Sequence, residues 1–456
     1  MLQLRHVIAR RVDRIPLGRR LARGAFWSVV GSVASRLLSV PVSIALARLM
    51  GPAHYGELAV IYSSVDLFGV FAGFGLGMTA TKHVAELRGK DPHRAGRILA
   101  LSTVTASLTG LVMAVLLFVL SPWLAARTLS AAHLTEPLRI GACLLFFASL
   151  SGAQCGALCG FEAFNTTARL GVIVGLLNVP LMVGGYLAYG LKGVLWGMVV
   201  GRFAEWVLRH LAVRAEARRA RVVIQYRECT RELSVLWQFS IPALLSGVLV
   251  MPVNWACAAI LVNQPNGYAE MGIYNAASQW YNGLLFLPVT IGAVLLPLLS
   301  DRMGEGDARG SSGVVGFMLR FNAATMLPCV IGLSLASPYI MRMYGREYSH
   351  AWLTLVLVVV TAGVFAVLSP VGDVIAASGR MWVGCAMNAG WALILVPSTF
   401  ILVHRGLGSF GLASARLFAY CVHALWTLLF AYKVLREATH GTNIENLQTI
   451  IAEPIP

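Results

Sequence analysis

The sequence predicts an all-α, polytopic membrane protein, because of its composition and the length of its apolar runs. Hydrophobic residues make up 57% of the 456 residues and charged residues only 12%, and the mean hydropathy is +0.73. Soluble globular domains contain about 25% charged residues, so this composition excludes a soluble enzyme and a disordered chain. The apolar residues come in long runs, whereas the strands of a membrane barrel would be short and alternating.

The apolar runs predict twelve transmembrane helices. A hydrocarbon core about 30 Å thick needs about 20 apolar residues per helix. The runs that reach this length are residues 24–47, 55–79, 98–120, 138–160, 170–190, 193–212, 234–262, 272–299, 314–336, 351–376, 381–403 and 409–432.

The basic residues predict the orientation of these helices. The formal net charge is +16 and the sequence pI is about 9.9. Most of the Lys and Arg residues fall in every second loop, and the positive-inside rule therefore places both termini in the cytoplasm. These loops explain the surplus without a nucleic-acid partner, and they would also bind anionic lipid headgroups. The middle loop is expected to hold Arg209, Arg214, Arg218, Arg219, Arg221, Arg227 and Arg231.

A short motif in the first half of the chain recurs in the second half. Pro52-Ala53-His54-Tyr55-Gly56-Glu57 matches Pro265-Asn266-Gly267-Tyr268-Ala269-Glu270 at Pro, Tyr and Glu, and Phe26 matches Phe239 at the same offset. Each copy follows the first helix of a six-helix half, and an even number of helices gives both halves one orientation. The sequence thus predicts two parallel-repeat six-helix lobes around a central cleft. The expected boundaries are a basic arm (1–23), an N-lobe (24–212), a basic cytoplasmic linker (213–233), a C-lobe (234–435) and a cytoplasmic tail (436–456).

Three arginines lie deep in the predicted helices. A charge at that depth costs at least about 2.5 kcal/mol and should face a protein interior or a wet cavity. Arg36 lies beside a stripe of serines, Arg202 lies on the sixth helix, and Arg416 is followed by Tyr420 and His423 at i+4 and i+7. Their planar, permanently charged forks suit a diphosphate, so Arg36, Arg202 and Arg416 are the candidate diphosphate-binding residues. Structural ion pairing, or snorkelling in the case of Arg416, is the alternative for each.

Two acidic residues accompany these arginines. Asp66 lies near the middle of the second predicted helix, and Glu205 lies three residues after Arg202 on one helix face. Asp66 and Glu205 either couple transport to a cation or a proton, or neutralise arginines. Because the deep arginines outnumber the deep acids, the cleft is expected to be slightly cationic and its ligand anionic.

Polar amides next to aromatic rings form a third group of candidates. Asn275, Gln279 and Asn282 share one face of the eighth predicted helix, near Tyr281, and Tyr420 lies on the twelfth. Sugars need hydrogen bonds along their edges and apolar contacts on their faces, so these five are the candidate sugar-contacting residues. Amides also bridge helices in membranes, and that alternative stays open.

The chain lacks the motifs of common enzymes. It contains no phosphate-binding loop of the Walker type, no His-Glu-x-x-His and no Gly-x-Ser-x-Gly, and its eight Cys include no Cys-x-x-Cys pair. We therefore expect neither an enzyme nor a cofactor nor a metal.

Several stretches resemble polysaccharide-biosynthesis flippases of the multidrug/oligosaccharidyl-lipid/polysaccharide exporter superfamily. They are Arg23-Gly24-Ala25-Phe26-Trp27-Ser28, Ala45-Leu46-Ala47-Arg48-Leu49-Met50-Gly51-Pro52, Tyr55-Gly56, Gly75-Leu76-Gly77 and Gly160-Phe161-Glu162-Ala163-Phe164. The resemblance covers the whole chain in topology and about residues 23–100 and 154–170 in motifs. Arg36 matches the family's habit of placing Arg in the first helix.

The resemblance implies a flippase in the bacterial inner membrane. Its substrate would be a polyprenyl-diphosphate-linked oligosaccharide, moved from the cytoplasmic to the periplasmic leaflet by alternating access. Twelve predicted helices, rather than the fourteen usual in relatives that flip the peptidoglycan precursor, favour an O-antigen, capsule or exopolysaccharide unit. The alternatives are a cation-coupled antiporter for drugs or other small molecules, a glycan polymerase or ligase, and a scaffold that recruits glycan polymerases and assembly proteins.

Overall fold

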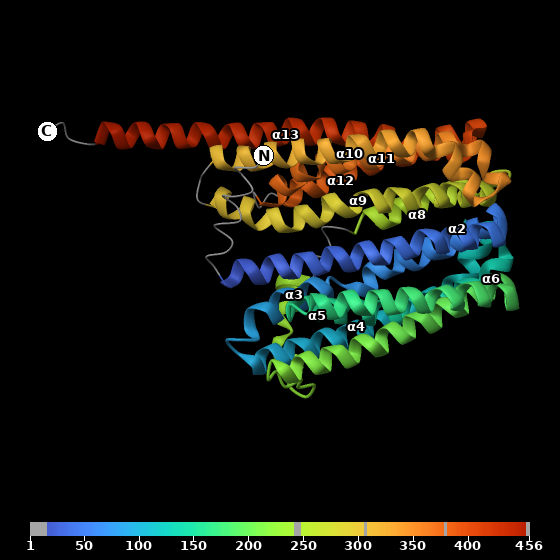
Figure 1. Ribbon diagram of the computed structural model, residues 1–456, viewed down its shortest axis with the longest axis horizontal. Helices are drawn as coiled ribbons and strands as arrows, with labels where there is room; N and C mark the ends of the chain where they lie inside the picture. Colours follow the sequence, from blue (N-terminus) through green and yellow to red (C-terminus); the bar gives the residue numbers. More distant parts are fainter. Residues whose placement is uncertain (1–15, 241–247, 305–307, 378–380, 453–456) are drawn as a thin grey trace. The chain divides into compact units, whose positions relative to one another are not determined.

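The computed structural model describes residues 16–240, 248–304, 308–377 and 381–452, and for parts of these ranges, including residues 16–39, the backbone alone. All regular structure in the described residues is helical (Figure 1). This confirms the all-α fold class.

The first half of the chain forms long helices joined by short turns (Figure 1). Its α-helices are α2 (Pro16–Gly73), α3 (Leu76–Leu87), α4 (Pro92–Trp123), α5 (Thr135–Gly160) and α6 (Phe164–Arg219). Short helical turns cover Leu124–Thr128, Ala132–Leu134, Cys229–Glu232 and Leu236–Ser240.

The second half also consists of helices joined by short connections. Its α-helices are α8 (Val250–Val262), α9 (Gly267–Gly304), α10 (Ala308–Tyr344), α11 (Trp352–Ala377), α12 (Met381–Leu402) and α13 (Gly408–Ala452). The short helical turn Arg346–Ala351 joins α10 to α11, and the turn Val403–Leu407 joins α12 to α13.

Some helices contain two of the predicted membrane spans. The backbone of α2 leaves the helical conformation at Gly51, with φ 70°, and that of α6 does so at Tyr189 and Gly190. A positive φ favours glycine because it has no Cβ, so Gly51 and Gly190 mark sharp bends between spans. Seven helical stretches of the described residues are long and apolar enough to cross a membrane, and two of them, Phe164–Arg219 and Trp382–Phe430, each cover two predicted spans. The count of twelve spans stays a prediction.

The chain divides into two compact units, whose boundaries differ from a simple cut in the middle. One unit comprises the chain up to Leu46 together with Ile61–Met251, and the other comprises Ala47–Val60 together with the chain from Pro252 onward. We call them unit 1 and unit 2. A short stretch of α2 therefore packs with residues that come some two hundred positions later.

That stretch of α2 meets α9 backbone against backbone. A Cβ on Gly56 would lie 1.8 Å from the carbonyl oxygen of Tyr268, and one on Gly272 would lie 2.0 Å from the carbonyl oxygen of Pro52. Small residues permit such close approach between helices in membranes. Tyr55 of the first copy of the repeated motif is buried, and Tyr268 of the second belongs to this crossing.

The segment expected as a linker packs onto unit 1. Helix α6 continues to Arg219, past its predicted end at residue 212, and the side chains of Val222 and Cys229 are buried. Val222 belongs to a core cluster with residues of α3, α4, α5 and α6. The segment is therefore attached to the helices that precede it.

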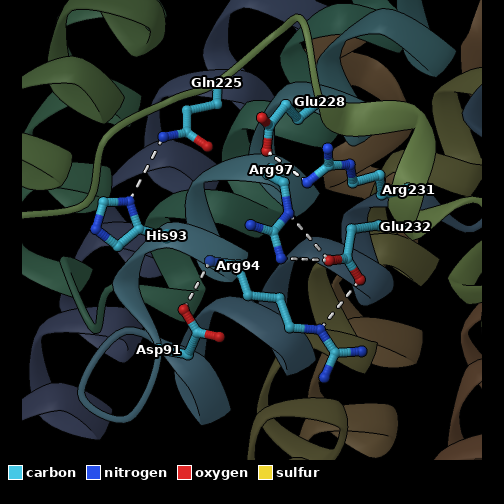
Figure 2. Close-up of polar contacts among 8 residues, drawn as sticks. All are labelled: Asp91, His93, Arg94, Arg97, Gln225, Glu228, Arg231 and Glu232. Atoms are coloured by element: carbon cyan, nitrogen blue, oxygen red, sulfur yellow. Dashed lines mark hydrogen bonds and ion pairs between the residues drawn. The ribbon is translucent and has the colours of Figure 1, made fainter.

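A buried carboxylate fixes the end of this segment to the start of α4. Arg94 Nε donates to Glu232 Oε2 at 3.0 Å, and Arg97 Nη2 donates to Oε1 at 2.9 Å (Figure 2). The Glu232 side chain is only 7% exposed. By contrast, the nearby pair of Arg231 and Glu228 lies at the surface, with side chains 70% and 44% exposed.

These two contacts give a matched pair of predictions. Glu232→Gln leaves two arginines without their shared carboxylate, and we expect it to destabilise the protein by about 1–3 kcal/mol. Glu228→Gln breaks only an exposed pair, which contributes about 0–1 kcal/mol. The apparent melting temperature of the detergent-solubilised protein should fall for Glu232→Gln and stay nearly unchanged for Glu228→Gln. Equal melting temperatures for the two variants would contradict the anchoring role of Glu232.

Candidate functional site

Among the described residues, each unit contains a cluster of polar side chains centred on residues that the sequence singled out. The cluster of unit 2 surrounds Arg416 and the cluster of unit 1 surrounds Glu205. The chemistry of the two clusters differs.

Three tyrosines enclose the guanidinium of Arg416 in unit 2. Arg416 lies on α13, and its Nη1 donates to the hydroxyl of Tyr274 on α9 at 2.7 Å. Its guanidinium carbon lies 4.9 Å from the ring centre of Tyr281, also on α9, and 6.0 Å from that of Tyr420 on α13. Aromatic faces attract cations at these distances. We call these four residues the Arg416 cluster.

The charge of Arg416 has no acidic counterpart in the described part of the chain. None of the salt bridges there involves Arg416, and its buried Nε has no hydrogen-bond partner among the described residues. A cation that is partly removed from water and has no acidic partner is costly to keep. A guanidinium that retains a free donor and its full charge can bind an anion, above all a phosphate or carboxylate that accepts from the fork.

Aromatic rings continue from Tyr420 along the same helix and onto its neighbours. The ring of Tyr420 lies 5.6 Å from those of Phe365 on α11 and Trp391 on α12, and 6.5 Å from that of His423. The His423 ring lies 5.8 Å from that of Trp426. The surroundings of Arg416 are therefore aromatic rather than acidic.

The cluster of unit 1 is a chain of paired charges. Glu205, on α6, accepts from Arg202 Nη1 at 2.8 Å and from Arg209 Nη2 at 2.6 Å. Arg202 also donates to the Tyr62 hydroxyl at 3.3 Å, and Arg209 to the Ser151 carbonyl at 2.9 Å. The Glu205 side chain is 8% exposed and that of Arg202 is 37% exposed. We call these five residues the Glu205 cluster.

Four residues predicted in the middle loop lie inside a helix, since α6 contains Arg209, Arg214, Arg218 and Arg219. The sequence prediction placed Arg209 in the middle loop, but it lies within α6 with its side chain 17% exposed and bound to Glu205. The continuation of α6 to Arg219 makes the arginines after residue 212 helical, and the ion pair with Glu205 keeps the charge of Arg209 within the helical part. Two cations share one carboxylate here, and Asp66, whose side chain is exposed, lies within electrostatic range of Arg202.

The other candidates are distributed as follows. Arg36 lies in α2, but its side chain is outside the described residues. Asn275 and Gln279 are half-buried and Asn282 is exposed, and none of the three forms a side-chain hydrogen bond to another described residue. Within the described residues, no group of His, Cys, Asp or Glu has the arrangement to hold a metal ion.

Sequence reasoning missed some residues of these clusters and of their surroundings. Arg209 follows Glu205 by four residues, and this spacing is a signal for a second ion pair. The contacts that Trp391 and Phe365 make with Tyr420 come from other helices, and no signal along a single sequence indicates which helices pack together.

Removing the shared carboxylate should unbalance the Glu205 cluster. In Glu205→Gln, Arg202 and Arg209 lose their common partner. We expect the free energy of unfolding to fall by about 2–3 kcal/mol. This is less than the cost of breaking a fully buried pair, because Arg202 is partly solvated. The apparent melting temperature of the purified protein measures this loss. The matched control is Glu216→Gln on the same helix, which breaks a pair with a single arginine, Arg219, whose side chain is 75% exposed. Melting of Glu205→Gln at the wild-type temperature would contradict the shared ion pairs.

Curated relatives of the chain are export and transport proteins. The chain is 24% identical over 418 residues to the EPS I polysaccharide export inner membrane protein EpsE of Ralstonia nicotianae, covering 88% of this chain and 92% of the relative. It is also 24% identical over 454 residues to the succinoglycan biosynthesis transport protein ExoT of Rhizobium meliloti, covering 92% and 81%.

The solved structures that are similar show the fold. An inward-facing multidrug resistance MATE family transporter of the MOP superfamily superposes with a TM-score of 0.74 at 16% identity, covering 91% of this chain and 99% of the other. A MOP superfamily transporter from Pyrococcus furiosus gives 0.62 at 15% identity, covering 92% and 96%.

A family profile covers more than half of the chain. The profile described as "Polysaccharide biosynthesis protein" matches residues 21–303. This confirms the family that the motifs between Arg23 and Phe164 resemble. The chain belongs to the polysaccharide biosynthesis protein family, and its fold is that of MOP superfamily transporters.

Proposed function

We propose that this protein is a flippase of a bacterial inner membrane, with both termini in the cytoplasm. Its substrate is a polyprenyl-diphosphate-linked oligosaccharide, the repeat unit of an O-antigen, a capsule or an exopolysaccharide. The protein moves this unit from the cytoplasmic to the periplasmic leaflet by alternating access of two lobes, residues 24–212 and 234–435. Family membership and the names of the EpsE and ExoT relatives support this proposal.

The observation that carries the proposal is the state of Arg416. It is enclosed by tyrosines, carries a free buried Nε and has no salt-bridge partner in the described part of the chain. A cation-binding exporter needs carboxylates at its site, whereas a diphosphate needs unneutralised donors. This chemistry supports an anionic substrate over the cationic drugs of the alternative function.

The remaining candidates take supporting roles in this proposal. Arg36 and Arg202 join Arg416 in holding the diphosphate, and Asn275, Gln279, Asn282, Tyr281 and Tyr420 contact the sugars. The double pairing of Glu205 favours charge neutralisation over ion coupling for that residue. The exposed Asp66 is left as the better candidate for coupling to an ion. Glycan polymerases and assembly proteins, as well as membrane lipids, are the proposed partners.

The test is a deletion of the gene in its own host. Cells without it should lose surface glycan and accumulate the lipid-linked oligosaccharide in the cytoplasmic leaflet, and the intact gene should restore both. Thin-layer chromatography of extracted lipids measures the accumulation, and a glycan stain measures the surface product.

A drug-efflux assay in cells that lack any surface glycan distinguishes the flippase from a small-molecule antiporter. If the protein is a flippase, drug efflux from these cells should be the same with and without it. Normal surface glycan in the deletion strain, together with efflux that depends on the protein, would overturn the proposal in favour of a small-molecule antiporter.

A further inference from the structure

We propose that unit 2 holds a saccharide-binding shelf, formed by Tyr420, His423 and Trp426 of α13 beside Arg416. Its ligand is the sugar ring next to the diphosphate of the substrate. This inference rests on the proposed function and assigns a place to one part of the substrate.

The three rings follow one another along one face of α13. They begin at Arg416, whose guanidinium lies 6.0 Å from the Tyr420 ring centre. Tyr420 and His423 are 6.5 Å apart with ring planes at 71°, and His423 and Trp426 are 5.8 Å apart at 70°. Spacings of three and four residues keep side chains on neighbouring parts of a helix surface. The rings therefore form a continuous aromatic surface that starts at the cation.

This surface differs from the most exposed side of α13. Phe418, Leu425 and Leu429 are 56%, 61% and 63% exposed. At 3.6 residues per turn they lie on the opposite side of the helix from Arg416, Tyr420 and His423. The shelf residues are half-buried and pack among α9, α11 and α12.

The polar atoms left over around the shelf are donors. Trp391 Nε1, Trp426 Nε1 and Arg416 Nε are buried and have no hydrogen-bond partner among the described residues. Buried donors are nearly always paired in proteins, and a tryptophan or arginine N–H can only donate. The missing partner must therefore offer acceptors. Sugar hydroxyl and ring oxygens and phosphate oxygens all do so.

The packing behind the shelf gives it a rigid back. Trp391 is only 3% exposed and contacts the Tyr420 ring from α12, and Phe365 contacts the same ring from α11. The indole of Trp426 packs against α12 at Gly390, where a Cβ would lie 2.8 Å from the indole. Fixed rings and N–H donors without a partner among the described residues suit a sugar, which has apolar C–H faces and oxygen-rich edges.

The test compares two ligands that differ in whether they carry a sugar. One is farnesyl diphosphate, and the other is the lipid-linked oligosaccharide extracted from cells that lack this gene. Native mass spectrometry of the full-length protein in detergent measures the affinity for each. Trp426→Leu should raise the Kd for the oligosaccharide about tenfold, the equivalent of roughly 1.4 kcal/mol, and leave that for farnesyl diphosphate unchanged. Trp426→Phe, which keeps a ring, should retain most of the affinity.

A matched control lies on α12. Trp382 is 82% exposed, so Trp382→Leu should bind both ligands as the wild type does. If Trp426→Leu binds both ligands normally, or loses both equally, the shelf is overturned while the proposed function stands. If the wild type binds neither ligand, the proposed function fails and the shelf fails with it. Unchanged binding of farnesyl diphosphate shows that the Trp426→Leu variant is folded.

Discussion

Cells that carry Arg416→Gln in place of the wild type are expected to lose nearly all surface glycan, and Arg416→Lys should retain a fraction. Glutamine removes the positive charge and the planar fork, whereas lysine keeps the charge alone. Hydrogen bonds to charged groups contribute about 1.5–3 kcal/mol each, so the loss of two of them from the diphosphate would weaken binding by at least about 100-fold. The measurement is surface glycan per cell, normalised to the amount of protein in the membrane.

The structure also predicts that this loss does not come from misfolding. Arg416 is half-buried among tyrosines and forms no salt bridge in the described residues, so a neutral residue there removes a partly desolvated charge. The melting temperature of Arg416→Gln should equal or exceed that of the wild type. The matched control is Arg320→Gln, since Arg320 is exposed on α10 and should be dispensable. Normal export by both Arg416→Gln and Arg416→Ala would show that Arg416 does not hold the diphosphate.

Gly56→Leu is expected to prevent the accumulation of folded protein. Its Cβ would lie 1.8 Å from a backbone oxygen of α9, which cannot rotate away as a side chain can. The helices would have to separate, and overpacking of this severity costs about 3 kcal/mol or more. Membrane protein level and the elution profile after solubilisation measure the effect.

Gly283→Leu, on α9, is the control for that substitution. A Cβ on Gly283 meets nothing within 4 Å, and leucine has the higher helix propensity by nearly 1 kcal/mol. Gly283→Leu should therefore accumulate at or above the wild-type level. Equal accumulation of Gly56→Leu and Gly283→Leu would refute the close crossing of α2 and α9.

Composition and the length of apolar runs were sufficient to predict the class of this fold. Charge scarcity and runs of about 20 apolar residues leave few options besides membrane helices. The ends of the helices were harder to predict, because polar residues such as Arg209 and Arg214 extend α6 beyond its apolar part. Hydropathy reports where the membrane ends, and a helix can continue into water.

The contents of the two clusters were predictable only along single helices. The spacing of Arg416, Tyr420 and His423 placed them on one face, and the structure brings Tyr420 next to both. Tyr274 and Trp391 reach Arg416 and Tyr420 from α9 and α12. Such contacts depend on which helices pack together, and the spacing of residues along the sequence does not indicate this.

The sharing of residues 47–60 with unit 2 has a consequence for biosynthesis. Gly56 leaves the ribosome more than two hundred residues before its packing partner Gly272. Translation adds about 5–20 residues per second, so the glycine face of this segment stays without its packing partner for roughly 10–40 s. During that interval it is a natural client for the insertion machinery. A fragment that ends before α9 should be a substrate for quality-control proteases, however well its own helices pack.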